Sequence, residues 1–307
     1  MIRYIAQRLL HAIPVLFGVS LITFLLTYLL PADPARMYAG PNASIETVNS
    51  IRHQLGLDRP FYQQYLIYIG RVLSGDLGFS YKLQMPVGDA ILSRFPYTMQ
   101  LTAAGIFFEL LLGLPIGLIS ALRPHTWLAR ASMLFVFFAV AAPPFWLGLM
   151  LLYFAAFKLG LFPIGGTGTL WHLVLPALAA GMGGAAWYAR LMRSSSLDVI
   201  RADYVRTARA KGLSERGVVL RHVMRNAILP IITLVGLDIP WFLSGVVLIE
   251  AVFAWPGMGK LAVDAVRNVD VPLILGTVLF TALIVVLSNI ATDLVYAFVD
   301  PRIRYGD

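Results

Sequence analysis

The chain alternates between long apolar runs and polar connections. Six runs are free or nearly free of charged residues, and a helix that crosses a bilayer needs about 20 apolar residues. These runs are Leu9–Leu30, Leu101–Leu122, Ala131–Phe157, Leu173–Ala189, Ala227–Leu248 and Val271–Val299. We therefore expect an all-α integral membrane protein with six transmembrane helices. The first run is longer than the apolar core of a signal peptide, so we expect it to be retained as a span.

The longest polar connection, Pro31–Tyr97, lies between the first two runs. Ser44, followed closely by an acidic residue, predicts a helix over Ser44–Leu55. Pro60 can begin a second helix, with apolar residues on one side, that ends at Gly75. The connection is too short for a domain with a large core of its own. We expect a small helical segment between the first two spans.

Lysine and arginine gather in the connections on one side of the six spans. That side carries Arg3, Arg8, Arg123, Arg130, Arg190, Arg193, Arg201, Arg206, Arg209, Lys211, Arg216, Arg221, Arg225, Arg302 and Arg304. The short connections on the other side carry Lys158, Lys260 and Arg267. Because short cytoplasmic loops hold the excess of basic residues, we expect both termini in the cytoplasm and the long connection outside it.

The composition supports a membrane protein. Of the 307 residues, 59% are hydrophobic and 13% are charged, whereas soluble domains carry about 25% charged residues. The net charge of +8 is explained by basic residues on one membrane face, so we expect no nucleic-acid partner. The chain contains no cysteine, which excludes disulfides, thiolate metal sites and cysteine nucleophiles.

A strongly basic stretch, Asp203–Pro230, lies between the fourth and fifth runs. Val205 and Ala208 recur near the helical period while the basic residues point elsewhere, which predicts a short amphipathic helix. Gly212 can adopt a positive φ and end this helix in a tight reversal. A second amphipathic piece, Glu215–Arg225, follows.

This stretch resembles a known motif. Arg206-Thr207-Ala208, followed by Gly212 and by Leu229-Pro230, is similar to the cytoplasmic EAA loop of ABC importer membrane subunits, in the variant typical of peptide and nickel permeases. Arg206 replaces the glutamate of the general motif, and the spacing from glycine to proline is longer. The alternative is a basic juxtamembrane segment that only fixes orientation and contacts lipid headgroups.

Further motifs resemble the same family, in the same order along the chain. They are Leu55-Gly-Leu-Asp-Arg-Pro60, Gly75-Asp-Leu-Gly-Phe-Ser80, Arg94-Phe-Pro-Tyr-Thr98, Phe253-Ala-Trp-Pro-Gly-Met-Gly259 and Asp300-Pro-Arg-Ile-Arg-Tyr305. The resemblance therefore covers nearly the whole chain and favours a coupling role for the basic stretch.

The resemblance implies the type I ABC importer permease fold in the bacterial cytoplasmic (inner) membrane. The expected parts are a first transmembrane helix (1–30), an extracytoplasmic segment (31–97), a five-helix core (98–299) and a cytoplasmic tail (300–307). A coupling loop (190–226) would insert a short helix into a groove of a separate ATPase. The residues expected at this contact are Tyr204, Arg206, Thr207, Ala208, Lys211, Gly212, Leu213 and Arg221.

The resemblance also implies partners. They are two ABC ATPase subunits that hold ATP and Mg²⁺, a second homologous six-helix permease, an extracytoplasmic substrate-binding protein and the lipid bilayer. The chain itself would bind no cofactor and catalyse no reaction. Gly257-Met-Gly-Lys260 lacks the leading glycine of a phosphate-binding loop and is followed by Leu261, where Ser or Thr should meet Mg²⁺. We interpret it as a turn before the last span.

The residue pattern does not support a metal site or a catalytic site with a serine nucleophile. The five histidines, His11, His53, His125, His172 and His222, show no metal-ligand spacing. Ser194-Ser-Ser196 has no histidine or carboxylate arranged around it, so we interpret it as a polar cluster at a helix end.

Ionisable residues inside spans are costly, and each is a candidate for function. Glu109, Asp238 and Asp293 lie within the apolar runs. Asp238-Ile-Pro240-Trp241 places a carboxylate, a helix irregularity and an aromatic ring near mid-span, as a path for polar cargo would require. The alternative for each carboxylate is a bond to a neighbouring helix. Pro143-Pro144-Phe145-Trp146 resembles a proline-aromatic element of the family. The expected pathway residues are Asp238, Trp241, Pro144, Trp146 and Glu109.

Three functions remain open at this stage. The first is an ATP-driven importer of dipeptides, oligopeptides or glutathione, favoured by the short connection Leu159–Trp171, or of nickel or metal chelates in the same family. The second is a proton-coupled secondary transporter that uses the carboxylates of the spans, but the chain shows no matching halves. The third is a membrane scaffold whose basic loop recruits a soluble partner.

Overall fold

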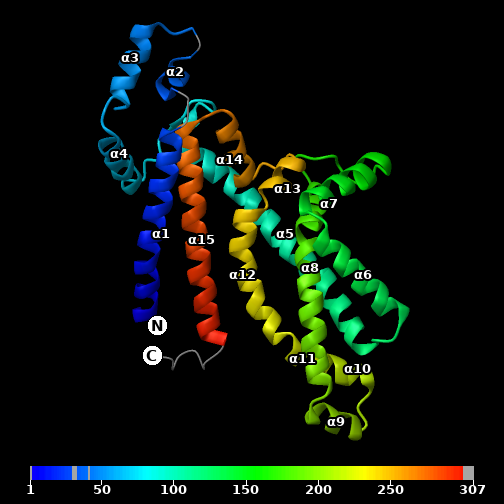
Figure 1. The fold of residues 1–307 in the computed structure, drawn as a ribbon. Helices are drawn as coiled ribbons and strands as arrows, with labels where there is room; N and C mark the ends of the chain where they lie inside the picture. Colours follow the sequence, from blue (N-terminus) through cyan, green and yellow to red (C-terminus); the bar gives the residue numbers. More distant parts are fainter. Residues whose placement is uncertain (1, 30–32, 41, 300–307) are drawn as a thin grey trace. The chain divides into compact units, whose positions relative to one another are not determined.

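The computed structural model describes residues 2–29, 33–40 and 42–299 (Figure 1). The predicted tail 300–307 and the motif Asp300–Tyr305 lie outside the described residues. Tertiary contacts divide the chain into two units. Unit 1 consists of Met1–Thr98 and Pro256–Ile290, and unit 2 consists of Met99–Trp255 and Ala291–Asp307. Helices α5 and α15 each contribute to both units.

Long apolar helices account for the predicted spans. Among the described residues, five helices or helical runs are long and apolar enough to cross a membrane: α1 (Ile2–Tyr28), α5 (Val87–Leu122), α8 (Leu170–Ile200), the run Glu215–Leu243 that includes most of α12 (Leu229–Gly245), and α15 (Val271–Val299). The sixth is a bent pair, α6 (Trp127–Ala141) and α7 (Pro144–Leu151), with η1 (Leu152–Lys158) as the π-helical continuation of α7. The prediction of six spans agrees with the structure when this pair counts as one.

The third predicted span, Ala131–Phe157, is not one straight helix. It bends by 110° between α6 and α7. Pro143 precedes α7 with φ −60° and ψ 137°. Two consecutive prolines remove two N–H donors, and each proline disfavours a helical conformation in the residue before it. The helix therefore breaks inside the run that was predicted as one span.

Two other spans extend beyond their apolar runs. The predicted span Leu101–Leu122 is the second part of α5, and Leu173–Ala189 is the middle of α8. Polar residues such as Gln100 and Arg190 ended the apolar runs without ending the helices, because a helix can continue past the hydrocarbon layer into water.

The connection between the first two spans contains short elements of unit 1. They are α2 (Pro34–Ala39), α3 (Ile45–Gln54), α4 (Phe61–Leu73) and the strands β1 (Phe79–Ser80) and β2 (Met85–Pro86). Ser44 caps α3 by accepting a hydrogen bond from the Thr47 N–H at 3.2 Å, and Pro60 precedes α4, as predicted. The antiparallel β1–β2 pair was not predicted, because two-residue strands carry no readable period.

The core of unit 1 joins the start of α5 to residues near the end of the chain. Val87 and Ile91 of α5 contact Met258 and Leu261 of α14 (Met258–Arg267), together with Ile274 of α15. The N–H of Met258 also donates to the Thr98 hydroxyl at 2.8 Å. Apolar burial and this bond fix α14 against the β1–β2 hairpin and α5.

In unit 2, α5 and α8 approach closely along glycines. A Cβ atom on Gly113 would lie 2.7 Å from the carbonyl oxygen of Ala185, and one on Gly181 would lie 2.6 Å from that of Gly105. A side chain at either position would therefore prevent this close approach of the two helices. Glycines on both helices bring their backbones together, which positions the mid-span carboxyl of α5, Glu109, near α8.

Candidate coupling and translocation sites

The basic stretch folds as a helix–turn–helix of unit 2. It contains α9 (Asp203–Ala210), α10 (Glu215–Val218), the π-helical segment η2 (Val219–Val223) and α11 (Met224–Ala227). Val205 and Ala208 are buried, while Tyr204 and Arg206 are exposed. Figure 1 shows α9 and α10 at the end of α8 that lies away from α7. The predicted amphipathic helix is confirmed, and its polar side faces outward.

The turn after α9 depends on Gly212. This residue has φ +79°, in the left-handed region that favours glycine. Its N–H donates to the carbonyl of Arg209 at 2.9 Å, and the Leu213 N–H donates to that of Ala208 at 3.4 Å. These two bonds form a Schellman motif. The side chain of Arg209 pairs with Glu215 at 2.7 Å across the turn. The predicted reversal at Gly212 is confirmed.

Apolar contacts connect the turn to two spans. Val205, Ala208, Val218 and Val223 form one buried cluster. Partly buried residues packed against this cluster come from α5 and α8 as well as from the turn itself: Leu118, Val199, Ile200 and Leu213. A force applied to the polar side of α9 would therefore reach α5 and α8 through side chains in contact.

The predicted contact residues divide into two groups. The side chains of one group are exposed, together with Gly212, and are available to a partner: Tyr204, Arg206, Thr207, Lys211, Gly212 and Arg221. Ala208 is buried and Leu213 is half-buried, and both belong to the packing beneath the turn. Ala208 and Leu213 therefore anchor the turn that carries the exposed group.

A second candidate site is a cavity of about 400 Å³ inside unit 2. It lies between α5, the bend of α6 and α7, α8 and α12. The residues that line it are Glu109, Ala139, Val140, Ala142, Pro144, Gly183, Gly184, Trp187, Tyr188, Leu234, Asp238 and Trp241. Its walls are mostly apolar and aromatic, with two carboxyl groups, as is typical of small-molecule sites.

The two carboxyls come from helices far apart in the sequence. Glu109 of α5 is 1% exposed, and its side chain fills the space beside Gly184, where a Cβ atom would collide with it. Asp238 of α12 accepts a hydrogen bond from the Tyr188 hydroxyl of α8. The Glu109 and Asp238 side chains interact with each other. Gly184 thus makes room for one carboxyl, and Tyr188 holds the other.

Four of the five predicted pathway residues line this cavity: Glu109, Pro144, Asp238 and Trp241. Trp146 does not line it, and its ring packs edge-on against Phe138 with 6.1 Å between centroids. Tyr188 and Gly184, which also line the cavity, were not among the predicted pathway residues. The adjacent Trp187-Tyr188 pair beside glycines was the signal that could have found them.

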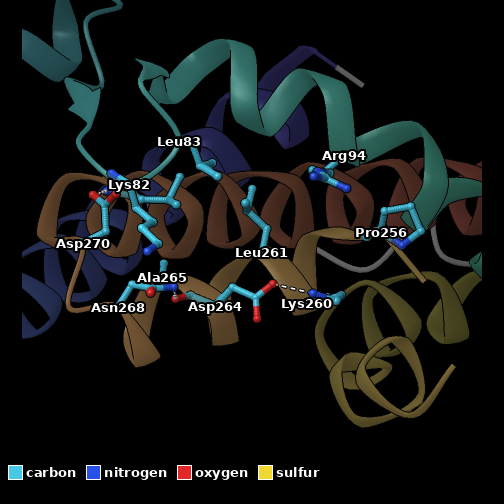
Figure 2. A pocket seen from close by; sticks show the side chains of 12 residues that line it. Lys82, Leu83, Arg94, Pro256, Lys260, Leu261, Asp264, Ala265, Asn268 and Asp270 are labelled. Atoms are coloured by element: carbon cyan, nitrogen blue, oxygen red, sulfur yellow. Dashed lines mark hydrogen bonds and ion pairs between the residues drawn. The ribbon is translucent and has the colours of Figure 1, made fainter. Parts of the chain in front are cut away.

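A third feature is a small pocket of about 60 Å³ in unit 1, shown in Figure 2. Asp270, 3% exposed, accepts hydrogen bonds from the Ser80 hydroxyl at 2.5 Å and from the Lys82 N–H at 3.2 Å. Lys260 forms an ion pair with Asp264 at 2.5 Å. Asp270 therefore fastens the β1–β2 hairpin to the start of α15.

The environment of the neighbouring Tyr81 favours its protonated form. Burial, followed by the nearby Tyr38 and Asp270, raises the pKa of Tyr81 to about 12, although Arg71 acts in the opposite direction. Burial also raises the pKa of Tyr68 to about 12. Within the part of the chain that the structure describes, no group of three or more His, Asp or Glu residues could hold a metal ion.

These features define a class of protein: a polytopic helical membrane protein with a cavity among its spans and an amphipathic turn packed against their ends. The chain belongs to the family of binding-protein-dependent transport system inner membrane components. The model of this family matches residues 113–305, and the model of its N-terminal region matches residues 1–102. The family predicted from the motifs is therefore confirmed.

Relatives match along the whole chain. The glutathione transport system permease protein GsiC of Escherichia coli K12 is 42% identical over 99% of this chain and 100% of its own length. The protein of the same name from Shigella flexneri serotype 5b has the same identity and coverage. The chain is therefore an inner-membrane permease component of an ABC importer.

Solved structures share the fold. A chain of the methionine ABC transporter MetNI, in an inward-facing conformation, matches with a TM-score of 0.54 and 18% identity, over 69% of this chain and 96% of that chain. A chain of an amino acid ABC transporter crystallised with histidines matches with a TM-score of 0.50 and 15% identity, over 67% and 92%. The predicted all-α ABC permease fold is confirmed.

Proposed function

We propose that this permease carries glutathione or similar short peptides into the cytoplasm. The observation that supports this cargo most directly is the 42% identity to the glutathione permease GsiC over 99% of the chain. The cavity of about 400 Å³ in unit 2 is compatible with a small polar ligand, since small-molecule pockets measure roughly 300–1,000 Å³.

In this proposal the energy comes from other subunits. The sequence has no complete phosphate-binding loop, so ATP and Mg²⁺ belong to two separate ABC ATPase subunits. A second six-helix permease completes the membrane part, and an extracytoplasmic binding protein delivers the cargo. The chain itself is not an enzyme.

The α9 turn is the proposed contact with an ATPase subunit. The exposed side chains of Tyr204, Arg206 and Lys211 would meet the ATPase, and the buried cluster beneath them would pass its movement to α5 and α8. Rigid short helices that are packed against spans can convert closure of one subunit into rotation of another. This role requires the turn, and therefore both termini, to lie in the cytoplasm, as the distribution of basic residues indicates.

The remaining parts follow the same proposal. Residues 1–30 form the first transmembrane helix, 31–97 an extracytoplasmic segment, 98–299 the transport core with its coupling loop (190–226), and 300–307 a cytoplasmic tail. The cavity residues Glu109, Pro144, Asp238 and Trp241 belong to the cargo path, and Trp146 supports the bend beside it.

Reconstitution tests the function. The tagged chain is purified with its copurifying subunits and placed in proteoliposomes with the binding protein and labelled glutathione. We expect uptake that requires both ATP and the binding protein. Uptake by the permease alone, or uptake driven by a proton gradient without ATP, would refute the proposal. Uptake of a nickel chelate in place of glutathione would refute the cargo and leave the permease assignment intact.

A further inference from the structure

One buried oxygen in the cavity of unit 2 lacks a partner. Glu109 is 1% exposed, and among the described residues its Oε2 atom has no hydrogen-bond partner. Burying a carboxyl oxygen without a donor is costly, and an unsatisfied buried polar atom in a native fold requires an explanation. Because Glu109 lines the cavity, a molecule inside the cavity can supply the missing donor.

The second carboxyl of the cavity, Asp238, is a further reason to expect a hydrogen-bond donor inside the cavity. Asp238 accepts its hydrogen bond from the neutral Tyr188 hydroxyl, and its other nearby polar group is Glu109. Among the residues that line the cavity there is no lysine or arginine. Arg190, two residues after Tyr188, does not line the cavity and stacks over the Trp187 ring at 4.3 Å from its centroid. Two acidic groups therefore share one apolar chamber without a basic residue in its wall.

A primary ammonium group fits this arrangement. It carries one positive charge and three N–H donors, so it can donate to both carboxyls at once and offset their mutual repulsion. The Trp241 ring, which also lines the cavity, adds an aromatic surface of the kind that attracts cations. A carboxylate has no donor for the Glu109 oxygen, and a neutral donor would not offset the repulsion between the two carboxyls.

We infer that Glu109 and Asp238 form a subsite that binds the free α-ammonium group of the cargo as it passes through the membrane. The inference rests on the proposed function, since it names the cargo end that the path recognises. Gly184 is part of the subsite because its missing side chain leaves room for the Glu109 carboxyl. Tyr188 is a positioning residue that orients Asp238.

The test compares two cargoes that differ only at the ammonium group. Complete importer in proteoliposomes is supplied with binding protein saturated with glutathione or with its N-acetyl form, and the two ATP-dependent uptake rates are measured. We expect the wild type to prefer glutathione. Glu109→Gln should reduce this preference at least about tenfold, the loss typical of one charge-assisted hydrogen bond.

Two further variants keep the result interpretable. Gly184→Ala places a methyl group where the Glu109 carboxyl lies, so it should reduce the preference without removing a charge. Asp293→Asn removes a carboxyl of α15 that does not line the cavity, and it should keep the wild-type preference. ATPase stimulation by the loaded binding protein, measured on each variant, confirms that the complex is assembled.

The outcomes separate the two proposals. An unchanged preference in both Glu109→Gln and Gly184→Ala would overturn the ammonium subsite and leave the importer function standing. Equal uptake of the two cargoes by the wild type would overturn it as well. Absence of ATP-dependent uptake of either cargo by the wild type would instead overturn the proposed function.

Discussion

The turn at Gly212 offers a sharp test of the coupling mechanism, because its replacement changes backbone strain and little else. A Cβ atom at this position would meet no other atom within 4 Å, so even a larger side chain finds open space. The φ of +79° is unfavourable for residues with a side chain, by about 1–2 kcal/mol, and more so for β-branched residues. Asparagine tolerates this region better than valine does.

We therefore predict different effects for Gly212→Val and Gly212→Asn. A penalty of about 1–2 kcal/mol lowers the ratio of the native turn to alternative conformations by about 5- to 30-fold. Gly212→Val should insert into the membrane normally and keep ATPase activity, yet transport up to that factor less cargo per ATP hydrolysed. Gly212→Asn should stay close to the wild type.

The assay measures both quantities in the same proteoliposomes: ATP hydrolysed and labelled glutathione taken up. The ratio of uptake to hydrolysis separates uncoupling from simple loss of protein. Wild-type coupling in Gly212→Val, or equal losses in the two variants, would refute the argument that the left-handed turn carries the coupling.

Three further predictions concern packing and charge. Gly117→Leu forces a side chain into the backbone of α8. Overpacking costs about 1–3 kcal/mol, so the melting temperature of the purified protein should fall by several degrees. An unchanged melting temperature would contradict the close packing of α5 against α8. Asp270→Ala removes the acceptor of the Ser80 hydroxyl, so the β1–β2 hairpin should exchange its amide hydrogens faster. Unchanged exchange would show that Asp270 does not anchor the hairpin. The pKa of Tyr81, raised from 10.0 to about 12, favours its protonated form in the folded state, so its contribution to stability is intact below pH 10 and lost as pH rises towards 12. Tyr81→Phe should therefore lose less thermal stability than the wild type between about pH 9 and pH 11, and equal losses would count against this assignment.

The turn at Gly212 shows how much the sequence could predict. The spacing of Val205 and Ala208 indicated the buried side of α9, and Gly212 indicated the reversal, because short helices and glycine turns are determined by neighbouring residues. The structure adds the Schellman bonds and the contacts with α5 and α8. Those contacts depend on which spans are neighbours, which a single sequence does not show.

The cavity shows where prediction from sequence ended. Glu109 and Asp238 were each recognisable as costly charges within spans. Their meeting depends on the close packing of α5 against α8 and α12 at glycines such as Gly105 and Gly113, and a single sequence does not show which helices are neighbours. Tyr188 was not predicted, because a tyrosine in an apolar run is compatible with ordinary packing.

The short elements of unit 1 between the first two spans were predicted in part. Ser44 and Pro60 marked the starts of two helices, since caps and first-turn prolines act locally. The β1–β2 hairpin and its bond from Ser80 to Asp270 were missed. Asp270 lies in a connection far along the chain, where an acidic residue is usually solvated, and its burial depends on a long-range contact.

The proposed coupling of ATP hydrolysis to transport depends most on direct contact between α9 and a separate ATPase subunit. The chain contains no cysteine, so Arg206→Cys on the exposed side of α9 gives one unique site for a photoreactive maleimide. In the assembled importer we predict cross-links from residue 206 to an ATPase subunit, with loss of ATP-dependent uptake, and none from the same label on Glu46→Cys of α3. Cross-linking of residue 206 to lipid alone, in complexes that transport normally, would contradict the account.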